Sequence, residues 1–204
     1  MPYLNRIPCV PEPIDCRILT AALDLFVSRG YHNVSVHDVQ KEANVSIGSI
    51  YNHFGGKEGI AKALYFHLLN EMEEMIDTVM RDHDSATQRC ETIIRLLFEY
   101  TETRANIIAY IFHAKHTEFI PGESPICDSS PFAKMRGIVQ QGMESGEFRS
   151  TDPWVATASV FGGAIRMIQL RLDGVIQQPL GGFLDEVLES AWQGMRVERT
   201  SESV

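Results

Sequence analysis

The sequence predicts an all-α protein of about nine helices, with an N-terminal three-helix head and a C-terminal helical body. Apolar residues recur at three- and four-residue steps along most of the chain, as helices need in order to pack one face on a core. Period-two alternation, the pattern of a half-buried strand, is almost absent. At 204 residues, of which 44% are hydrophobic, the chain is long enough to bury a substantial core.

Capping residues and helix breakers place the ends of these helices. The first helix ends at Gly30, and Pro131 and Pro153 each open a helix, because Pro fits the first helical turn. The segment PGESPICDSS from Pro121 is predicted to be a loop. The predicted helices cover 14–29, two short segments between 35 and 54, 57–82, 86–102, 105–119, 131–145, 153–173 and 180–197.

The segment between Gly30 and Lys57 carries the strongest functional signal. Ser35 can cap the first short helix, and Asp38 follows it at the spacing of a reciprocal capping box. Asn44 stands where the chain must turn, and Asn tolerates the left-handed backbone that a tight corner needs. Two short helices meeting at such a corner predict a helix-turn-helix, whose second helix enters the major groove of DNA.

The same segment resembles the DNA-binding signature of the tetracycline-repressor (TetR, AcrR-like) family of bacterial transcriptional regulators. The resemblance rests on the run VSIGSIYNHF at 45–54, on Lys57 and Glu58, and on Gly30 and Tyr31. Further matches lie in the family's first helix, at Ile18, Ala22, Leu25 and Phe26. The resemblance covers about residues 14–62.

This resemblance implies a helix-turn-helix DNA-binding domain over 1–62, with its core at 14–58, and an effector-binding and dimerisation domain over 63–204. We call residues 1–62 the head. One position departs from the family pattern: Gln40 stands where the family usually has Ala. A side chain of this length must turn outward, or the two short helices must cross less closely.

The residues expected to contact DNA lie mainly on the second short helix. Ile50 and Phe54 can anchor that helix inward, which leaves its other side chains free for the groove. Tyr51 can touch a thymine methyl or a phosphate, while Ser35 and Lys57 resemble family positions that hold phosphates at helix N-termini. The full expected set is Ser35, Ser46, Ile47, Gly48, Ser49, Tyr51, Asn52, His53 and Lys57.

The last two long helices are the expected dimer interface. Small residues such as Ala158 and Gly162 make a smooth ridge that another helix can approach, and Leu184, Leu188 and Trp192 lie on the apolar stripe of the final helix. The alternative is that this ridge packs only within its own subunit.

The middle of the body, 85–150, is where the family binds small effectors. The residues that can line an apolar pocket are Tyr110, His113, Phe132, Met135, Phe161 and Arg166. The alternative for the apolar ones is ordinary core. An Arg inside an apolar helix is either paired with a carboxylate or available for an anionic ligand.

Charge supports a protein that recognises DNA by geometry. The net charge is −9, but the head holds six basic and six acidic residues, so all of the excess negative charge lies in 63–204. The N-terminus has no signal-peptide pattern, and the most apolar segment, 155–172, carries Arg166 and Arg171. We therefore expect a cytoplasmic protein with no membrane partner. No nucleotide loop, GxSxG or HExxH motif is present, so we expect neither an enzyme nor a cofactor.

Together these patterns predict a ligand-responsive DNA-binding regulator. The resemblance implies a repressor that binds a palindromic operator as a homodimer and is released by a small-molecule effector. One alternative is a metal- or thiol-sensing regulator, because His113 and His116 are spaced for one helix face, with Cys127 nearby, although a zinc site wants four ligands. The other is a helical ligand-binding protein that has lost DNA binding.

Overall fold

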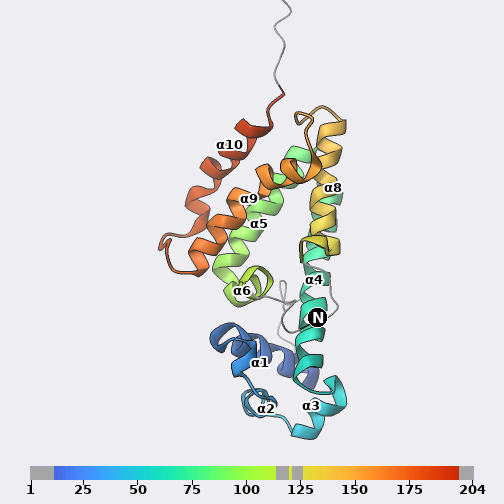
Figure 1. The fold of residues 1–204 in the computed structure, drawn as a ribbon, viewed down its shortest axis with the longest axis vertical. Helices are drawn as coiled ribbons and strands as arrows, with labels where there is room; N and C mark the ends of the chain where they lie inside the picture. The colour runs from blue at the N-terminus through green and yellow to red at the C-terminus, as the bar shows by residue number, and fades with distance from the viewer. Residues whose placement is uncertain (1–11, 114–119, 121–125, 198–204) are drawn as a thin grey trace, which may run out of the picture. The chain divides into compact units, whose positions relative to one another are not determined.

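The structure is a computed structural model that describes residues 12–113, 120 and 126–197. These residues form nine α-helices, three 3₁₀ turns and no strand, which confirms the all-α prediction (Figure 1). The elements are α1 (Ile14–Arg29), η1 (Tyr31–Asn33), α2 (Val36–Ala43), α3 (Ile47–Phe54), α4 (Lys57–Asp82), α5 (Ala86–Thr103), α6 (Ala105–His113), η2 (Ile126–Asp128), α8 (Ser130–Glu144), α9 (Pro153–Leu172), η3 (Leu180–Phe183) and α10 (Leu184–Met195).

The helix ends predicted from the sequence lie within a residue or two of the observed ends wherever the chain is described. Asp152 caps α9 by accepting hydrogen bonds from the backbone N–H groups of Trp154 and Val155, with Pro153 in the first turn. The predicted final helix divides into the short η3 and then α10. Of the predicted helix 105–119, residues 114–119 lie outside the part of the chain that is described.

The chain divides into two compact units. The first comprises the described residues up to Met72 together with those of Arg104–Ser129, and the second comprises Glu73–Thr103 and the described residues from Ser130 onward. The first unit therefore includes the head, the first part of α4 and also α6. The domain limits 1–62 and 63–204 stay a prediction.

The core of the first unit is built around α1, which packs against α2, α3 and α6. Ile18, Val39 and Ile50 are fully buried there, one from each of the three helices of the head. Two long-range polar bonds hold the unit together: the Tyr110 hydroxyl donates to the carbonyl of Ala61, and the Asn106 amide donates to the carboxylate of Asp24. The hydrogen bonds from α6 thus reach both α4 and α1.

The core of the second unit forms between α5, α8, α9 and α10. Ile93, Ile94 and Leu97 of α5 are fully buried, as are Val160 and Ile168 of α9. Within the described residues no helix is long and apolar enough to cross a membrane.

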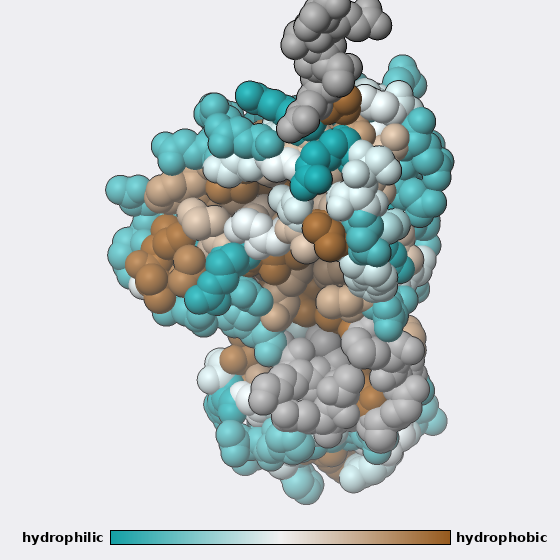
Figure 2. Space-filling model, turned by 45° about the horizontal axis from the view of Figure 1, so that its top comes forward, coloured by the Kyte–Doolittle hydropathy of each residue, from teal (hydrophilic) through white to brown (hydrophobic). Residues whose placement is uncertain are grey.

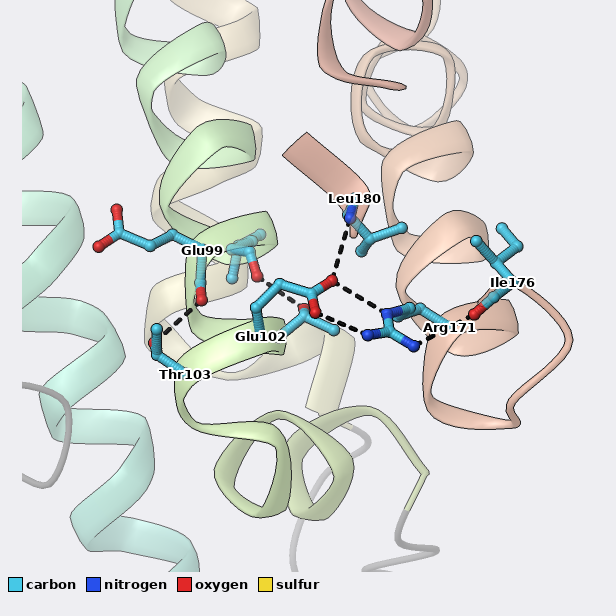
Figure 3. A network of polar contacts seen from close by, with 8 residues as sticks. Glu99, Glu102, Thr103, Arg171, Ile176 and Leu180 are labelled. Carbon is cyan, nitrogen blue, oxygen red and sulfur yellow. Dashed lines mark hydrogen bonds and ion pairs between the residues drawn. The ribbon is translucent and has the colours of Figure 1, made fainter. Parts of the chain in front are cut away.

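Two carboxylates accept hydrogen bonds at the two ends of α5 and so stabilise this second unit. Glu102 near the end of α5 accepts hydrogen bonds from Arg171 Nε at 3.0 Å, from Arg171 Nη2 at 2.8 Å and from the N–H of Leu180 at 3.0 Å (Figure 3). Arg171 also donates to the carbonyl of Ile176. The ion pair of Arg171 with Glu102 and this hydrogen bond together hold the loop between α9 and η3. Glu147 holds the other end of α5 by accepting from the first N–H groups of the helix, those of Ala86 and Thr87.

Candidate DNA-binding site

The corner between α2 and α3 has the geometry that the sequence predicts. Ser35 and Asp38 form the full reciprocal capping box: the Asp38 N–H donates to the Ser35 hydroxyl, and the Ser35 N–H donates to the Asp38 carboxylate. A hydrogen bond from the Ser35 hydroxyl, and then the one from the Ser35 N–H, lower the pKa of the Asp38 carboxyl. Asn44 lies in the left-handed region at φ 51° and ψ 54°, and the Ser46 hydroxyl caps α3 by accepting from the N–H of Ser49.

One face of α3 is presented to solvent. Ile50 is fully buried and Phe54 is half-buried, so these two side chains anchor the helix. On the other side Ile47 is 36% exposed and Tyr51 is 56% exposed. The remaining exposed residues of this face are Ser46, Gly48, Asn52 and His53, while Ser49 is half-buried. An exposed face on the second helix of such a corner is what a helix-turn-helix presents to the major groove.

Nothing in the described part of the chain requires the glycine at position 48. A Cβ atom built there would meet only the Ser46 hydroxyl, at an ordinary 3.8 Å. Gly48 also has no positive φ. Because Gly48 has no side chain, another molecule can come close to the backbone of α3 at this position, as a helix that lies against DNA requires.

Two residues expected to hold phosphates are engaged within the head. The hydroxyl and N–H of Ser35 are both bonded to Asp38. Lys57 Nζ donates to the carbonyl of Tyr31 at 3.1 Å and lies 4.2 Å from the centre of the Tyr31 ring. Burial, and then the nearby Glu58, raise the pKa of the Tyr31 hydroxyl. A phosphate bound by Lys57 would have to compete with, or share, the bond to Tyr31.

Gln40 does not turn outward into solvent. It is half-buried, and its side-chain amide donates to the carbonyl of Val45 at 3.0 Å. Arg17 of α1 also reaches the corner and donates to the carbonyls of Ala43 and Asn44, at 2.6 Å each. Sequence reasoning missed Arg17, since its partners are 26 and 27 residues away and no local pattern marks them.

The residues predicted to line an effector pocket fall in both units. Tyr110, bonded to Ala61, and the exposed His113 belong to the first unit. In the second unit Met135 and Phe161 are buried and Phe132 is half-buried. Arg166 is exposed on α9, with its guanidinium 3.4 Å from the Gln169 side-chain oxygen. The pocket stays a prediction.

The residues predicted for a dimer interface divide by burial. Ala158 is exposed and Gly162 half-buried on α9, whereas Leu184 and Leu188 are buried by the chain's own helices. Trp192 donates from its indole to Glu91 at 2.9 Å and stacks on Phe148. The final helix therefore uses much of its apolar stripe inside its own subunit, and the dimer interface stays a prediction.

A groove of about 410 Å³ lies between α9 and α10, which pack side by side (Figure 1). Gly163, Arg166 and Met167 contribute to it from α9, Phe183 contributes from the end of η3, and Val187 contributes from α10. On the face of the second unit that Figure 2 presents, hydrophobic and near-neutral residues lie between hydrophilic ones at the margins.

The residues for metal or thiol sensing are not brought together in the described part of the chain. Among those residues no three His, Cys, Asp or Glu side chains are grouped to hold a metal ion. Cys16 and Cys90 are buried, and burial raises the pKa of the Cys90 thiol. Cys127 is exposed, while His116 lies outside the described residues.

Comparison with known proteins decides the family. Residues 18–64, which span most of α1 through the start of α4, match the family described as bacterial regulatory proteins, tetR family. The chain carries a TetR-family DNA-binding domain. This match confirms the predicted class of DNA-binding transcriptional regulator.

Relatives that match the chain beyond the head are also regulators. The chain is 24% identical to the fatty acid metabolism regulator protein of Bacillus subtilis over 162 residues, 74% of this chain and 79% of that protein. It is 29% identical to the HTH-type transcriptional regulator BetI of Brucella melitensis over 114 residues, 53% of this chain and 58% of BetI. These relatives are transcriptional regulators, and neither supports the alternative of a helical protein that has lost DNA binding.

Solved structures show the same fold. The fatty acid degradation regulator FadR of Bacillus halodurans has a TM-score of 0.76 at 19% identity, over 88% of this chain and 95% of its own. FadR of Bacillus subtilis, solved in complex with stearoyl-CoA, has a TM-score of 0.67 at 22% identity, over 89% of this chain and 99% of its own. These likenesses extend the shared fold well beyond the head, over most of the chain.

Proposed function

We propose that this TetR-family protein is a repressor in the cytoplasm that binds a palindromic operator as a homodimer and leaves the operator when a long-chain acyl-CoA binds. The observation that carries the DNA-reading part is the exposed face of α3, capped by Ser46 and anchored by Ile50. Ile47, Gly48 and Tyr51 are proposed to face the base edges, with Asn52 and His53 toward the sugar–phosphate backbone.

The dimer is proposed because one head offers only the eight residues of α3 for contact with bases, too little for tight and selective binding. The proposed interface is the outer face of α9 and α10. It includes Ala158, Gly162 and the groove lined by Met167 and Val187. Leu184, Leu188 and Trp192 support this face from inside the subunit instead of meeting the partner. Two such pairs of helices would make a four-helix interface.

The effector class is proposed from the relatives, since one is named for fatty acid metabolism and another was solved with stearoyl-CoA. The chain has apolar side chains suited to an acyl tail in Phe132, Met135 and Phe161. Arg166 is not proposed as a ligand group, because it is exposed on the groove side of α9.

The link from effector to α4 is proposed to run through α8. The Ser130 hydroxyl and the Lys134 ammonium at the start of α8 both bond Glu73 of α4, at 2.7 and 2.9 Å. Lys134 also bonds Asp77, one turn further along α4. A ligand that prefers one position of α8 therefore biases α4 as well, and only such differential binding can change affinity for DNA.

The test begins with a duplex selected by the protein from a randomised DNA pool. Binding of this duplex is measured by fluorescence anisotropy while stearoyl-CoA, free CoA and free stearate are added in separate titrations. The proposal expects a palindromic selected sequence, two protein chains per duplex, and release by stearoyl-CoA at concentrations where CoA and stearate have no effect. A selected duplex that stearoyl-CoA does not release refutes the effector class alone.

A further inference from the structure

The corner between α2 and α3 leaves backbone carbonyl groups that helix hydrogen bonds do not satisfy. The N–H groups of Asn44 and Val45 turn back to the carbonyls of Lys41 and Gln40, each at 3.2 Å, and this closes the end of α2. The carbonyls of Ala43, Asn44 and Val45 come after that closure, so the helix offers them no backbone donor. A corner with three such carbonyls needs donors from elsewhere to hold one conformation.

Two side chains supply those donors. Arg17 Nη2 lies 2.6 Å from the Ala43 carbonyl and 2.6 Å from the Asn44 carbonyl, so one nitrogen serves both through its two hydrogens. Gln40 Nε2 donates to the Val45 carbonyl at 3.0 Å. Gln40 also accepts the Val45 N–H on its own carbonyl, so Gln40 holds both polar groups of Val45. Both side chains are half-buried, and their bonds to the Ala43 and Val45 carbonyls are partly buried, which strengthens those two bonds relative to bonds in water.

We infer that Arg17 and Gln40 form a clamp that sets the direction in which the recognition helix α3 leaves the corner. The peptide plane that carries the Val45 carbonyl leads directly to Ser46, the cap of α3. A peptide unit is planar, so a hydrogen bond to its oxygen restrains how the whole unit can turn. After this unit, only the two backbone dihedrals of Ser46 remain before the helix begins. Arg17 and Gln40 are positioning residues, and the inference rests on the DNA-reading role of α3.

The clamp has a consequence for specificity that a purely stabilising contact would lack. Without it, the head spends part of its time with α3 turned away from the geometry that reaches base edges. The apparent dissociation constant rises in inverse proportion to the competent fraction, and a dimer that reads two half-sites incurs this factor twice. Phosphate contacts position the protein but carry no sequence information, so binding to random DNA depends less on the angle of α3.

Two variants test the clamp, each with a matched control. Gln40→Met keeps the length of the side chain and removes its donor, and Gln88→Met makes the same change at an exposed site on α5. Arg17→Lys keeps the positive charge but replaces the planar guanidinium, and Arg95→Lys makes that change at an exposed site on α5. The charge of the head is unchanged in all four variants, so salt-dependent attraction to DNA is held constant.

The measurement is the affinity of each protein for the duplex selected by the wild type and for a random-sequence duplex, together with its melting temperature. Gln40→Met is expected to lose about tenfold for the selected duplex, roughly threefold per head as for one lost hydrogen bond, and less than about twofold for random DNA. Arg17→Lys is expected to lose more, because two carbonyls depend on it. The controls should keep both affinities.

Gln40→Met and Arg17→Lys proteins that melt at a lower temperature but keep the wild-type ratio of selected to random affinity would overturn the inference. The clamp would then stabilise the fold only. Failure of the wild-type protein to select any sequence is a separate outcome, because it removes the DNA-reading role itself and the inference with it.

Discussion

Replacing Tyr51 by Ala is expected to abolish useful operator binding while the head stays folded. Tyr51 is 56% exposed, and the covered part of its ring lies beside Gly56, where an added Cβ atom would be 3.6 Å from Tyr51 Cε1. A tyrosine side chain offers about 200 Å² of area, of which a little under half is covered here. At about 25 cal/mol/Å² this gives at most about 2 kcal/mol of folding free energy, or a fall in melting temperature of roughly 4–8 °C.

The expected loss of DNA affinity is larger. A base contact is worth about 1–3 kcal/mol, and a symmetric dimer loses it at both half-sites. The sum is about 2–6 kcal/mol, which raises the dissociation constant roughly thirtyfold to more than ten-thousandfold. Fluorescence anisotropy with the selected duplex measures this change at about 20 °C, well below the melting temperature expected of an ordinary folded domain.

Two companion variants sharpen the result. Tyr51→Phe keeps the ring: retained affinity indicates contact with a thymine methyl, and a loss of about tenfold indicates a hydroxyl bond to phosphate. Phe66→Ala removes an exposed aromatic ring from α4 instead of α3 and is expected to leave DNA binding unchanged. Operator affinity that is unchanged in Tyr51→Ala would refute the assignment of this face of α3 to DNA.

Three further changes are expected to act on stability. Hydrogen bonds from Arg171 lower the folded-state pKa of Glu102. The stability that the Glu102 carboxylate contributes is therefore present above the unfolded pKa of about 4.3 and is lost as pH falls through the folded pKa. Glu102→Gln should melt about 4–8 °C below wild type at about pH 7, for a loss of about 2 kcal/mol, with a smaller difference at about pH 3. A difference that is the same at both pH values would contradict this account. Gly59→Ala should destabilise the first unit by more than about 3 kcal/mol, since its Cβ would fall 1.7 Å from the Phe54 carbonyl oxygen, and a melting temperature equal to wild type would refute the clash. Asp152→Ala removes the cap of α9 and should cost about 1 kcal/mol in urea unfolding, whereas Asp152→Asn should cost less.

The head could be predicted from sequence because its signals are local. Ser35 and Asp38 are three residues apart, and Asn44 adopts its left-handed backbone within the corner itself. Such motifs depend on neighbours along the chain, and the structure contains them as predicted. Gln40 could be predicted only in part. The sequence shows that its side chain is long, but its hydrogen bond to the Val45 carbonyl depends on how the corner folds.

The body could be predicted only in part because its signals are ambiguous in space. A helical stripe such as the one holding Leu184 and Leu188 indicates that a face is buried, but not whether its own subunit or a partner covers it. The bond between Glu102 and Arg171 joins residues 69 positions apart, and no periodicity marks such a pair.

Because α6 belongs to the first unit, it limits where such a regulator can be cut and joined to another to make a chimera. Ile107, Ile108 and Ile111 of α6 are buried, and Asn106 bonds α1 across 82 positions. A fragment cut after residue 62 would leave α1 without the helix that covers it, so it would expose apolar surface and tend to aggregate. A chimera that exchanges DNA specificity must therefore carry two separate pieces of chain, one ending in α4 and one containing α6, since a single crossover divides a folded unit.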